Sequence, residues 1–451
     1  MDHFEKDLQM TRRIAELAAE QGGRAYFVGG YVRDHLAGRE NKDIDVEIHG
    51  LTPRQAESLL DSLGQRLTIG ESFGIYGLRG YHVDIALPRK ETLRGSGHRD
   101  FDVCVDPFIG TEKAAMRRDF TVNAMMQDVL TGEIVDHFGG REDLKQGILR
   151  HVSRETFVED PLRVLRGAQF AARFEFAVAE ETMALCSSME LCHLPRERIT
   201  EELKKALLKA ERPSVFFEVL RRMGRLTEWF PELEALIGIG QNPVHHAEGD
   251  VWIHTMMVVD QAAKLRERAE NPFGFMLAAV THDFGKAICT EEIGGVIHAY
   301  EHETKGLPLV EQFLKRLTGE RKLRDYVCNL VRLHMKPFTV AAANASIKTT
   351  NKMFDQAVDP EALICIAEAD NRGKISDHPS ADHGDFLQQR LSVYREYMSR
   401  PCVMGRDLIE AGLNPNDRFS DLLALAHKLR LAGIPKEQAL KQVLAEARKK
   451  K

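Results

Sequence analysis

The sequence lacks the long apolar run of a membrane protein. No stretch of its 451 residues approaches the roughly 18–20 uninterrupted apolar residues that a membrane-spanning helix requires. The N-terminal segment MDHFEKDLQMTRRIAELAAEQ has the pattern of an amphipathic helix, without the apolar core of a secretory signal. These two absences predict a cytoplasmic protein that has no membrane partner.

Paired cysteines and excess positive charge are also lacking. The seven cysteines form no CxxC pair, and their odd number argues against a disulfide framework. Lys and Arg number 62 against 68 Asp and Glu, a net charge of −6, which excludes a uniformly basic nucleic-acid coat but permits a local basic groove. With 43% hydrophobic and 29% charged residues, the composition is typical of a folded globular protein.

Changes of pattern along the chain predict four domains. Residues 1–150 alternate β-branched runs with short helical segments, which indicates an α+β head. Residues 151–240 have helical periodicity, and the glycine- and proline-bearing stretch 237–250 predicts a boundary. Residues 241–395 are again helical and rich in histidine, and 396–451 form a last helical segment.

A pair of glycines follows the first β-branched run. Val28 ends the run, Gly29 and Gly30 permit a tight turn, and Tyr31 can begin a helix. Such a turn leaves backbone N–H groups free to bind an anion. The segment is neither a P-loop nor a GxGxxG motif, so the glycine pair alone is weak evidence for a phosphate site.

The next predicted strand carries acids on one face. Asp43, Asp45 and Glu47 alternate with aliphatic residues, and residues two apart on one face lie roughly 6.5–7 Å apart. Asp43 and Asp45 can therefore converge on two divalent ions roughly 3.5–4 Å apart, although a solvated edge strand would show the same alternation. Asp84 lies inside an apolar run, where a carboxylate is costly unless it is paired or binds a cation. If its strand lies beside the first, Asp84 completes a three-acid site.

Four ordered segments resemble a known superfamily. They are GGYVRD (29–34) with DIDVE (43–47), MRRDFTVNAM (116–125), DHFGGREDLKQGILR (136–150) and EDPLRVLRGAQFAARF (159–174). Together they resemble the tRNA nucleotidyltransferases and bacterial poly(A) polymerases. The resemblance implies an α+β head of the polymerase-β-like type, followed by an all-α neck, body and C-terminal part. It also implies addition of CCA, from CTP and ATP, to the 3′ end of tRNA without a nucleic-acid template.

The resemblance assigns roles to the residues of these segments. Asp43, Asp45 and Asp84 would be catalytic. Asp43 and Asp45 would hold two Mg²⁺ ions, and Asp84 would complete this metal site. Asp119 and Asn123 would share a helix face that recognises the sugar hydroxyls. The implied nucleotide-binding residues are Gly29, Gly30, Arg33, Arg117, Arg118, Asp119, Asn123, Glu159, Asp160, Arg163 and Arg166.

The segment EDPLR is suited to selecting a base. On a helix, Asp160 and Arg163 would share a face, and Glu159 would hold Arg163 in place. The acid can accept from the exocyclic amine of cytosine or adenine, and the arginine can donate to the neighbouring ring position. Uracil and guanine present no amine there. Alone, the segment would more simply be a charge pair at a helix start with proline in the first turn.

One position departs from the family pattern. Gln169 stands where the usual run has a further arginine, while Arg163 and Arg166 match. Both side chains donate hydrogen bonds, but only arginine carries charge. We therefore expect a change in triphosphate affinity or in the switch from C to A.

A second constellation lies in the histidine-rich part. His254, His282, Asp283 and Asp370 occur in the order H…HD…D, which resembles the HD superfamily of metal-dependent phosphohydrolases. The resemblance implies that these four residues hold a transition metal such as Ni²⁺ or Mn²⁺, with Fe²⁺ and Zn²⁺ also compatible. His302 and His334 would be ligands of a second metal or of the substrate. A fused domain that folds without hydrolytic activity is the alternative.

The combined prediction is a CCA-adding nucleotidyltransferase with tRNA, CTP and ATP as partners. Its HD domain would act on 2′,3′-cyclic phosphate or 2′-phosphate ends of RNA. Three alternatives stay open: a poly(A) polymerase, an enzyme that adds only CC or only A, and an HD phosphohydrolase whose head only binds RNA. The sequence predicts neither the oligomeric state nor what ends the addition.

Overall fold

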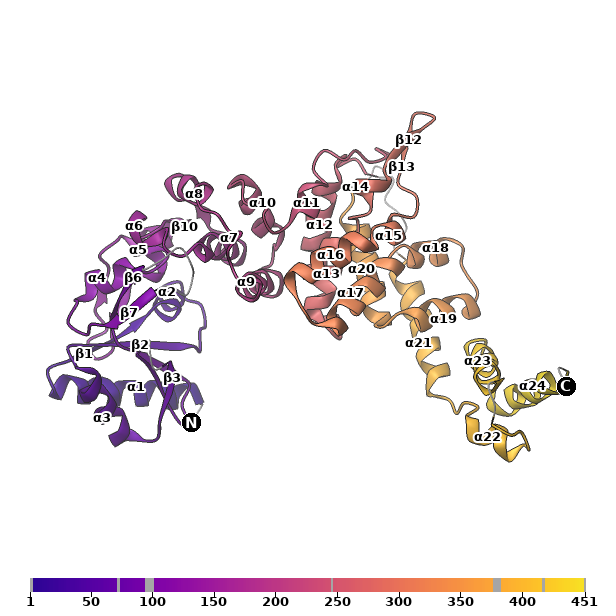
Figure 1. Cartoon of the computed structure of the whole chain (residues 1–451), viewed down its shortest axis with the longest axis horizontal. Coiled ribbons are helices and arrows are strands. Elements are labelled where there is room, and N and C mark those ends of the chain that lie inside the picture. The colour runs from indigo at the N-terminus through magenta and orange to yellow at the C-terminus, as the bar shows by residue number, and fades with distance from the viewer. Residues whose placement is uncertain are drawn as a thin grey trace. The chain divides into compact units, whose positions relative to one another are not determined.

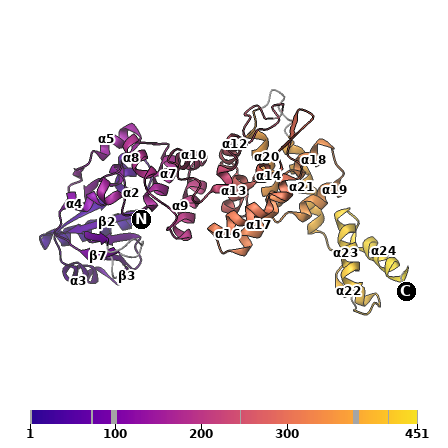
Figure 2. The same ribbon diagram turned by 45° about the horizontal axis from the view of Figure 1, so that its top comes forward.

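The computed structural model describes residues 3–70, 74–93, 101–244, 246–375, 383–415 and 418–449. The chain divides into two compact units, the first made of Met1–Ala206 and Val215–Trp229, the second of Leu207–Ser214 and Phe230–Lys451 (Figures 1 and 2). The domain boundaries expected at 150, 240 and 395 stay predictions. Among the described residues, no helix is both long and apolar enough to cross a membrane.

Seven strands form one mixed sheet in the described part of the first unit, in the order β3-β4-β5-β2-β1-β8-β9. Strands β2 and β5 run parallel, and the other neighbours run antiparallel. The strands are β1 (Arg24–Val28), β2 (Ile44–His49), β3 (Arg66–Gly70), β4 (Ile75–Leu78), β5 (Val83–Ala86), β8 (Met126–Asp128) and β9 (Ile134–Val135). A separate antiparallel pair consists of β6 (Arg89–Leu93) and β7 (Phe101–Val105).

Two helices cover one face of the sheet. The apolar residues of α1 (His3–Glu20) and α3 (Pro53–Leu63) form one core cluster with Ile44, Val46 and Ile48 of β2. Side chains alternate along a strand, so Asp45 and Glu47 lie on the opposite face of β2.

The rest of the first unit is mostly helical. Its elements are α2 (Gly30–Leu36), α4 (Thr111–Met116), the 3₁₀ turn η2 (Thr121–Asn123), α5 (Gly140–Gln146), β10 (Ile148–Leu149), α6 (Arg154–Phe157), α7 (Leu162–Phe174), β11 (Ala177–Val178), α8 (Glu180–Ser187), α9 (Arg196–Lys209) and α10 (Ser214–Arg222). The helices α9 and α10 run across the division between the two units in the sequence.

The second unit is built around helix α13 (Pro272–Thr281). This helix begins at Asn271, whose side chain accepts a hydrogen bond from the Gly274 N–H, with proline at its first position. Its residues from Gly274 to Thr281 are all buried, as expected for a helix that is apolar on every side. It packs against α12 (Val251–Ala263), α17 (Arg321–Leu333) and α20 (Pro360–Arg372).

The other elements of the second unit surround this bundle. They are α11 (Pro231–Glu234), η3 (Arg266–Arg268), α14 (Lys286–Cys289), β12 (Glu291–Ile293), β13 (Val296–His298), α15 (His302–Lys305), α16 (Leu307–Leu317), α18 (Lys336–Ala342), α19 (Ile347–Gln356) and α21 (Gly384–Ser399). A small separate core joins α22 (Gly405–Glu410), α23 (Arg418–Leu431) and α24 (Lys436–Lys449). The predicted α+β head followed by a helical body is confirmed. The hairpin β12–β13 is an exception that an all-α prediction missed.

Candidate functional sites

The acidic face of the head sheet brings two predicted carboxylates side by side. Asp45 on β2 is the register partner of Asp84 on the parallel strand β5, and register partners project from the same face of a sheet. Asp45 is half-buried, Asp84 is exposed, and Asp43 lies exposed immediately before β2. The two strands are adjacent, which is the condition for a three-acid site, and the metal-binding role of the acids stays a prediction.

The charges of these acids act on one another. Burial raises the pKa of Asp45 to about 6, the Arg118 guanidinium opposes this rise, and Asp84 and Asp43 add to it. Oxygen-rich sites of this kind are what Mg²⁺ prefers in proteins. The donor set therefore fits the predicted magnesium ions, because a divalent cation would relieve the mutual repulsion of the acids.

Glu47 extends the acidic face inward and was not among the predicted site residues. Its side chain is buried, 2.8 Å from His49 Nε2 and 3.6 Å from Arg118 Nη2. Burial favours the neutral acid, but the hydrogen bond of His49 and the charge of Arg118 hold the pKa of Glu47 below its ordinary value. The period-two alternation that identified Asp43 and Asp45 also points to Glu47.

The glycine turn lies against this face. Gly29 has φ 66° and precedes α2, and a Cβ atom built on it would lie 3.3 Å from Arg118 Nη1 and 3.6 Å from Asp45 Oδ2. Arg118 and Asp45 therefore both lie next to the turn, and Arg118 also contacts Glu47. A phosphate at the turn would meet backbone N–H groups and a guanidinium.

Arg33, expected to bind triphosphate, is buried and makes internal contacts. Its Nε and Nη2 donate to Asp34 at 2.8 and 2.9 Å, and its Nη1 donates to Asn123 Oδ1 at 2.7 Å. The guanidinium also lies over the Phe174 ring, 4.2 Å from its centroid. A Cβ atom on Gly30 would lie 3.5 Å from Arg33 Nη2, so the guanidinium supports the turn from within.

Asp119 and Asn123 lie together, although not on the expected helix face. Their segment forms the 3₁₀ turn η2 rather than an α-helix, and Asn123 Nδ2 donates to Asp119 Oδ1 at 2.9 Å. Arg166 of α7 donates through Nε to Asp119 Oδ2 at 2.8 Å. Burial opposes ionisation of Asp119, but Arg166 and Asn123 hold its pKa below the ordinary value. A buried polar chain thus connects α2, η2 and α7.

The predicted base-selecting residues lie at the start of α7. This helix begins at Leu162, so Glu159 and Asp160 lie before it. The expectation that Asp160 and Arg163 share a helical face was therefore wrong. Asp160 accepts from the Leu162 N–H at 3.1 Å and pairs with Arg198 at 3.0 Å. Arg163 donates to two backbone carbonyls at 2.6 Å, those of Thr156 and Arg117.

Gln169 lies fully buried in the middle of α7. Its amide Nε2 has no hydrogen-bond partner among the described residues. Among the described residues, then, no acceptor for this amide explains a glutamine at this position.

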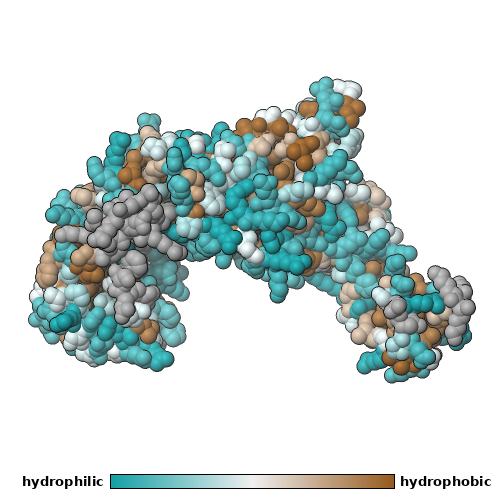
Figure 3. Space-filling model, in the orientation of Figure 1, coloured by the Kyte–Doolittle hydropathy of each residue, from teal (hydrophilic) through white to brown (hydrophobic). Residues whose placement is uncertain are grey.

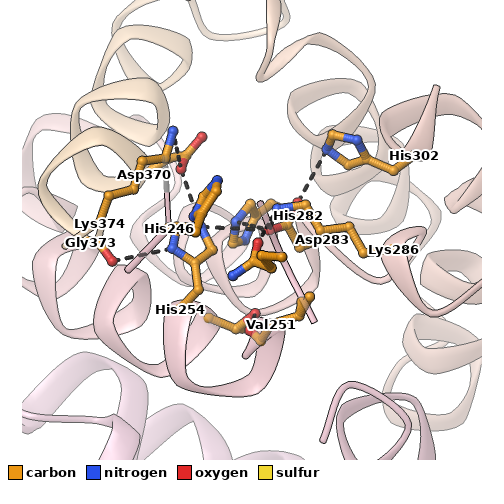
Figure 4. Close-up of polar contacts among 12 residues, drawn as sticks. His246, Val251, His254, His282, Asp283, Lys286, His302, Asp370, Gly373 and Lys374 are labelled. Carbon is orange, nitrogen blue, oxygen red and sulfur yellow. Dashed lines mark hydrogen bonds and ion pairs between the residues drawn. The ribbon is translucent and has the colours of Figure 1, made fainter. Parts of the chain in front are cut away.

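The HD residues come together in the second unit (Figure 4). Two groups of three place all their ligand atoms within 4.8 Å of one another, and every side chain in them is buried. These six residues, which we call the HD cluster, are His254, His282 and Asp370 in one group and Asp283, His302 and His334 in the other. The expected convergence of residues from α12, α13, α15, α17 and α20 is thus present in the structure.

Backbone carbonyls orient three of the imidazoles. The Nδ1 atoms of His282, His302 and His334 lie 2.8, 2.9 and 2.6 Å from the carbonyl oxygens of the residues three positions earlier. A ligating histidine commonly donates its other ring nitrogen in this way, which leaves Nε2 to bind a metal. The Nε2 atoms of His254 and His282 are buried and face carboxylates, 3.2 Å from Asp370 Oδ1 and 3.2 Å from Asp283 Oδ2 respectively.

Asp283 lies between the two groups. Its Oδ2 is 3.2 Å from His282 Nε2 and 3.6 Å from His254 Nε2, and its Oδ1 is 3.2 Å from His302 Nε2. Imidazole nitrogens and carboxylate oxygens are suitable ligands of Mn²⁺, Fe²⁺, Ni²⁺ and Zn²⁺. These converging buried nitrogen and oxygen atoms fit a transition metal.

Two residues of this site were missed from the sequence. His246, regarded as part of a linker, lies with its Nδ1 2.8 Å from Glu248 Oε1, and the same oxygen is 3.1 Å from His254 Nδ1. Burial opposes ionisation of Glu248, but hydrogen bonds from His254, the Ile375 N–H and His246 lower its pKa to about 2. A carboxylate behind a ligating histidine is a typical outer partner in metal sites. His245 lies outside the described residues.

A pocket of about 450 Å³ opens onto the HD cluster. Its lining includes residues of the HD cluster, the side chains of Lys286 and Lys374, and the rings of His298 and Tyr300. Asp283 and His302 of the cluster face this pocket together with the lysines and the rings.

Relatives match most of the chain, and two family models match segments within its first 237 residues. The model of the "Poly A polymerase head domain" matches residues 25–150, and that of the "Probable RNA and SrmB- binding site of polymerase A" matches residues 175–237. The multifunctional CCA protein of Actinobacillus pleuropneumoniae serotype 5b (strain L20) is 36% identical over 375 residues, covering 79% of this chain and 88% of that protein. The multifunctional CCA protein of Alkalilimnicola ehrlichii is 36% identical over 407 residues, covering 86% and 94%.

Solved structures share the fold. The Bacillus stearothermophilus CCA-adding enzyme in complex with CTP matches with a TM-score of 0.68 at 21% identity, covering 100% of this chain and 99% of that one. The Thermotoga maritima CCA-adding enzyme complexed with tRNA matches with a TM-score of 0.64 at 20% identity, covering 97% and 95%. These matches establish the same arrangement of a sheet-containing head and a helical body.

Proposed function

The chain belongs to the family of multifunctional CCA proteins, and from this premise we propose that it adds CCA, from CTP and ATP, to the 3′ end of tRNA. The observation that carries the proposal is the pairing of Asp45 and Asp84 on neighbouring parallel strands, beside a glycine turn and Arg118. The names of the relatives, and CCA-adding enzymes solved with ATP, CTP or tRNA, support it.

The head residues suit in-line transfer of a nucleotide. The 3′ oxygen of the RNA bonds to the α-phosphorus, the bond from that phosphorus to the bridging oxygen breaks, pyrophosphate leaves, and the hydroxyl proton passes to solvent. Magnesium ions held by Asp43, Asp45 and Asp84 would stabilise negative charge on the reacting oxygens. Arg118 and the backbone of Gly29 and Gly30 would hold the triphosphate.

The function is tested by supplying the four nucleotides separately and together to tRNA that lacks its 3′ CCA. We expect addition of C, C and then A with Mg²⁺, followed by arrest. Continuous oligo(A) on arbitrary RNA would indicate a poly(A) polymerase, and arrest after CC or a requirement for preformed CC would indicate a partial enzyme.

Gly29→Ala is expected to damage both the fold and nucleotide addition. The positive φ of 66° disfavours any side chain, and the new Cβ would lie 3.3 Å from Arg118 Nη1. Strain of this kind costs about 1–3 kcal/mol. Gly38→Ala is the matched control, because Gly38 has the same φ with no described atom within 4 Å of its Cβ position. The unfolding temperature should fall in both variants, whereas the rate of nucleotide addition should fall only for Gly29→Ala. Equal activities would contradict a role of this turn in the site.

We further propose that Asp160 and Arg163 select the base. In the structure Asp160 pairs with Arg198 and Arg163 donates to carbonyls, so both would exchange these partners for the edge of cytosine or adenine. A carboxylate and a guanidinium supply the acceptor and donors that those edges require.

Replacing Asp160 or Arg163 by alanine is expected to relax base choice. A lost base contact costs about 1–3 kcal/mol, so the preference for CTP and ATP over UTP and GTP should fall about 5- to 150-fold. Competitive incorporation into truncated tRNA measures this preference, and tRNA binding should change less. Arg154→Ala, which removes an exposed arginine of α6, serves as the control. Retained discrimination in both site variants would contradict selection by this pair.

We also propose a second activity, hydrolysis of phosphoesters at the HD cluster. The convergence of imidazole nitrogens and carboxylate oxygens in the buried cluster supports it, since His254 Nε2 and His282 Nε2 each lie 3.2 Å from a carboxylate oxygen, as ligands of one metal would. A bound transition metal would supply a hydroxide-like nucleophile at neutral pH. In the reaction, the oxygen of water bonds to phosphorus, one P–O ester bond breaks, and the departing ribose oxygen takes up a proton. The predicted substrates are 2′,3′-cyclic phosphates and 2′-phosphates of RNA ends.

A further inference from the structure

The hairpin β12–β13 stands beside the HD cluster without contributing to a core. Gly294 and Gly295 connect its strands with φ values of 62° and 83°, the sign pattern of a type I′ turn that fixes a two-residue hairpin. All three residues of β12 are exposed. Hydrophobic side chains reach solvent at the hairpin (Figure 3), among them Ile293 and Val296, which are 51% and 41% exposed.

Two aromatic rings lie at the base of this hairpin. The rings of His298 and Tyr300 are stacked, with centroids 4.9 Å apart and planes at 11°. Both line the pocket that opens onto the HD cluster, and Tyr300 is 57% exposed. An exposed ring at the edge of a polar pocket suits stacking of a nucleobase, whose flat apolar face needs no specific hydrogen bond.

The backbone fixes these rings relative to the HD cluster. Ala299 lies between them, and its carbonyl oxygen is 2.9 Å from Nδ1 of His302. The Nε2 of the same imidazole lies 3.2 Å from Asp283 Oδ1. The hydrogen bond between Ala299 and His302 therefore holds the two rings, which flank Ala299 in the sequence, close to the HD cluster.

Two lysine side chains that line the pocket could bind a phosphate. Lys286 Nζ lies 2.7 Å from Asp283 Oδ2, and Lys374 Nζ lies 3.2 Å from Asp370 Oδ1. Both lysines line the pocket beside the cluster carboxylates. An ester with its phosphate at the cluster would thus meet positive charge at one end and an aromatic surface at the other.

We propose that His298 and Tyr300 form a stacking platform for the terminal base of an RNA 3′ end whose phosphate lies at the HD cluster. The inference rests on the proposed hydrolase site and narrows its substrates to phosphoesters of nucleosides in RNA. Small phosphorylated metabolites without a base would bind only through their phosphate.

The test compares ligands with and without a base. Calorimetry on the full chain measures binding of adenosine 2′-monophosphate, glycerol 2-phosphate and a short oligoribonucleotide ending in a 2′-phosphate. Tyr300→Ala should weaken binding of the adenosine ligand and the oligonucleotide about 5- to 150-fold and leave glycerol 2-phosphate unchanged. Tyr300→Phe, which keeps the ring, should bind as the wild type does.

Two controls separate the platform from other causes. Ile288→Ala removes a side chain that is 62% exposed on α14 and lies outside the described lining of the pocket, and it should change nothing. Metal content, measured after loading with Ni²⁺ or Mn²⁺ and dialysis, should be equal in all variants. Because Tyr300 lies in the second unit, an effect of its substitution is separable from nucleotide binding to the head.

The platform is overturned if Tyr300→Ala binds the adenosine ligand as tightly as the wild type, or if the wild type binds it no more tightly than glycerol 2-phosphate. An oligonucleotide that binds no more tightly than glycerol 2-phosphate would contradict an RNA end as the substrate. Failure of the proposed hydrolase is a different result, in which the wild type retains no metal and cleaves none of the three ligands. The binding comparison decides the platform in either case.

Discussion

Replacing Asp45 with asparagine is expected to lower the rate of CMP and AMP addition to truncated tRNA by at least about 10³-fold. Asp45 lies between Asp43 and its register partner Asp84, so its loss removes the central ligand of the proposed magnesium site. Stabilisation of charge by metal ions supplies several kcal/mol, and each 1.4 kcal/mol corresponds to about tenfold in rate.

The same variant is expected to fold at least as stably as the metal-free wild type. Burial and the neighbouring acids raise the pKa of Asp45 to about 6, so its contribution to stability is present below the ordinary carboxyl pKa and is lost as pH rises through about 6. Asparagine carries no charge to bury, so the wild type should lose stability relative to the variant over this interval. Thermal unfolding in chelator at pH 4 to 7 measures the difference.

The assay has a matched control and a clear contrary result. Asp61→Asn changes an exposed acid of α3 and should retain full activity in the four-nucleotide assay. Addition by Asp45→Asn within tenfold of the wild type would refute the proposed catalytic site. Loss of phosphoester hydrolysis in the same variant would contradict two independent sites.

Replacing His282 with glutamine is expected to abolish retention of a transition metal and to lower phosphoester hydrolysis at least about 100-fold. His282 Nε2 is buried and faces the Asp283 carboxylate, 3.2 Å from its Oδ2. Loss of an outer partner of a metal ligand already costs about 10- to 100-fold in affinity or activity, so loss of a ligand should cost more. CCA addition in Mg²⁺ should persist, because it depends on the head.

Metal content after loading and dialysis, measured by elemental analysis, tests this prediction directly. His427→Gln is the control, because it changes a histidine that is 41% exposed at its side chain and pairs with Asp355. Since a buried substitution can impair folding, circular dichroism and retained CCA addition should accompany each measurement. A His282→Gln protein that keeps both its metal and its hydrolytic activity would show that the HD cluster is not the hydrolytic site.

Local periodicity was enough to predict the acids of the head but not all of their surroundings. Alternation along one strand placed Asp45 on the polar face, and the apolar neighbours of Asp84 indicated a special environment for its charge. The sequence did not contain the parallel pairing that makes these two residues partners. That pairing depends on strand order, which forms only when distant segments pack.

The wrong details have local or tertiary causes. Asp160 precedes a proline, and a residue in that position is disfavoured from helical conformation, so the later start of α7 was predictable. The segment with Asp119 and Asn123 gave no such signal. There, Phe120 bridges to His151 and Arg166 pairs with Asp119, and these contacts favour a 3₁₀ turn over a helix.

Glu248 shows what spacing cannot predict about the HD cluster. The order H…HD…D identifies side chains that converge when the helices α12, α13 and α20 pack together. Glu248 reaches His254 because the chain before α12 meets the end of α20, where the Ile375 N–H donates to its carboxylate at 2.9 Å. Contacts between loops follow from tertiary folding and leave no periodic pattern in the sequence.

The buried polar chain in the head joins the glycine turn, proposed to hold the phosphates, to the helix that carries Arg163, proposed to read the base. It runs from Asp34 through Arg33, Asn123 and Asp119 to Arg166, with every link between 2.7 and 2.9 Å. Its ends support the glycine turn and the helix that carries Arg163. Under the proposed roles, a base that displaced α7 would disturb Arg33 and the glycine turn, and so would misalign its own triphosphate. Errors in base selection would be rejected as slow chemistry as well as weak binding.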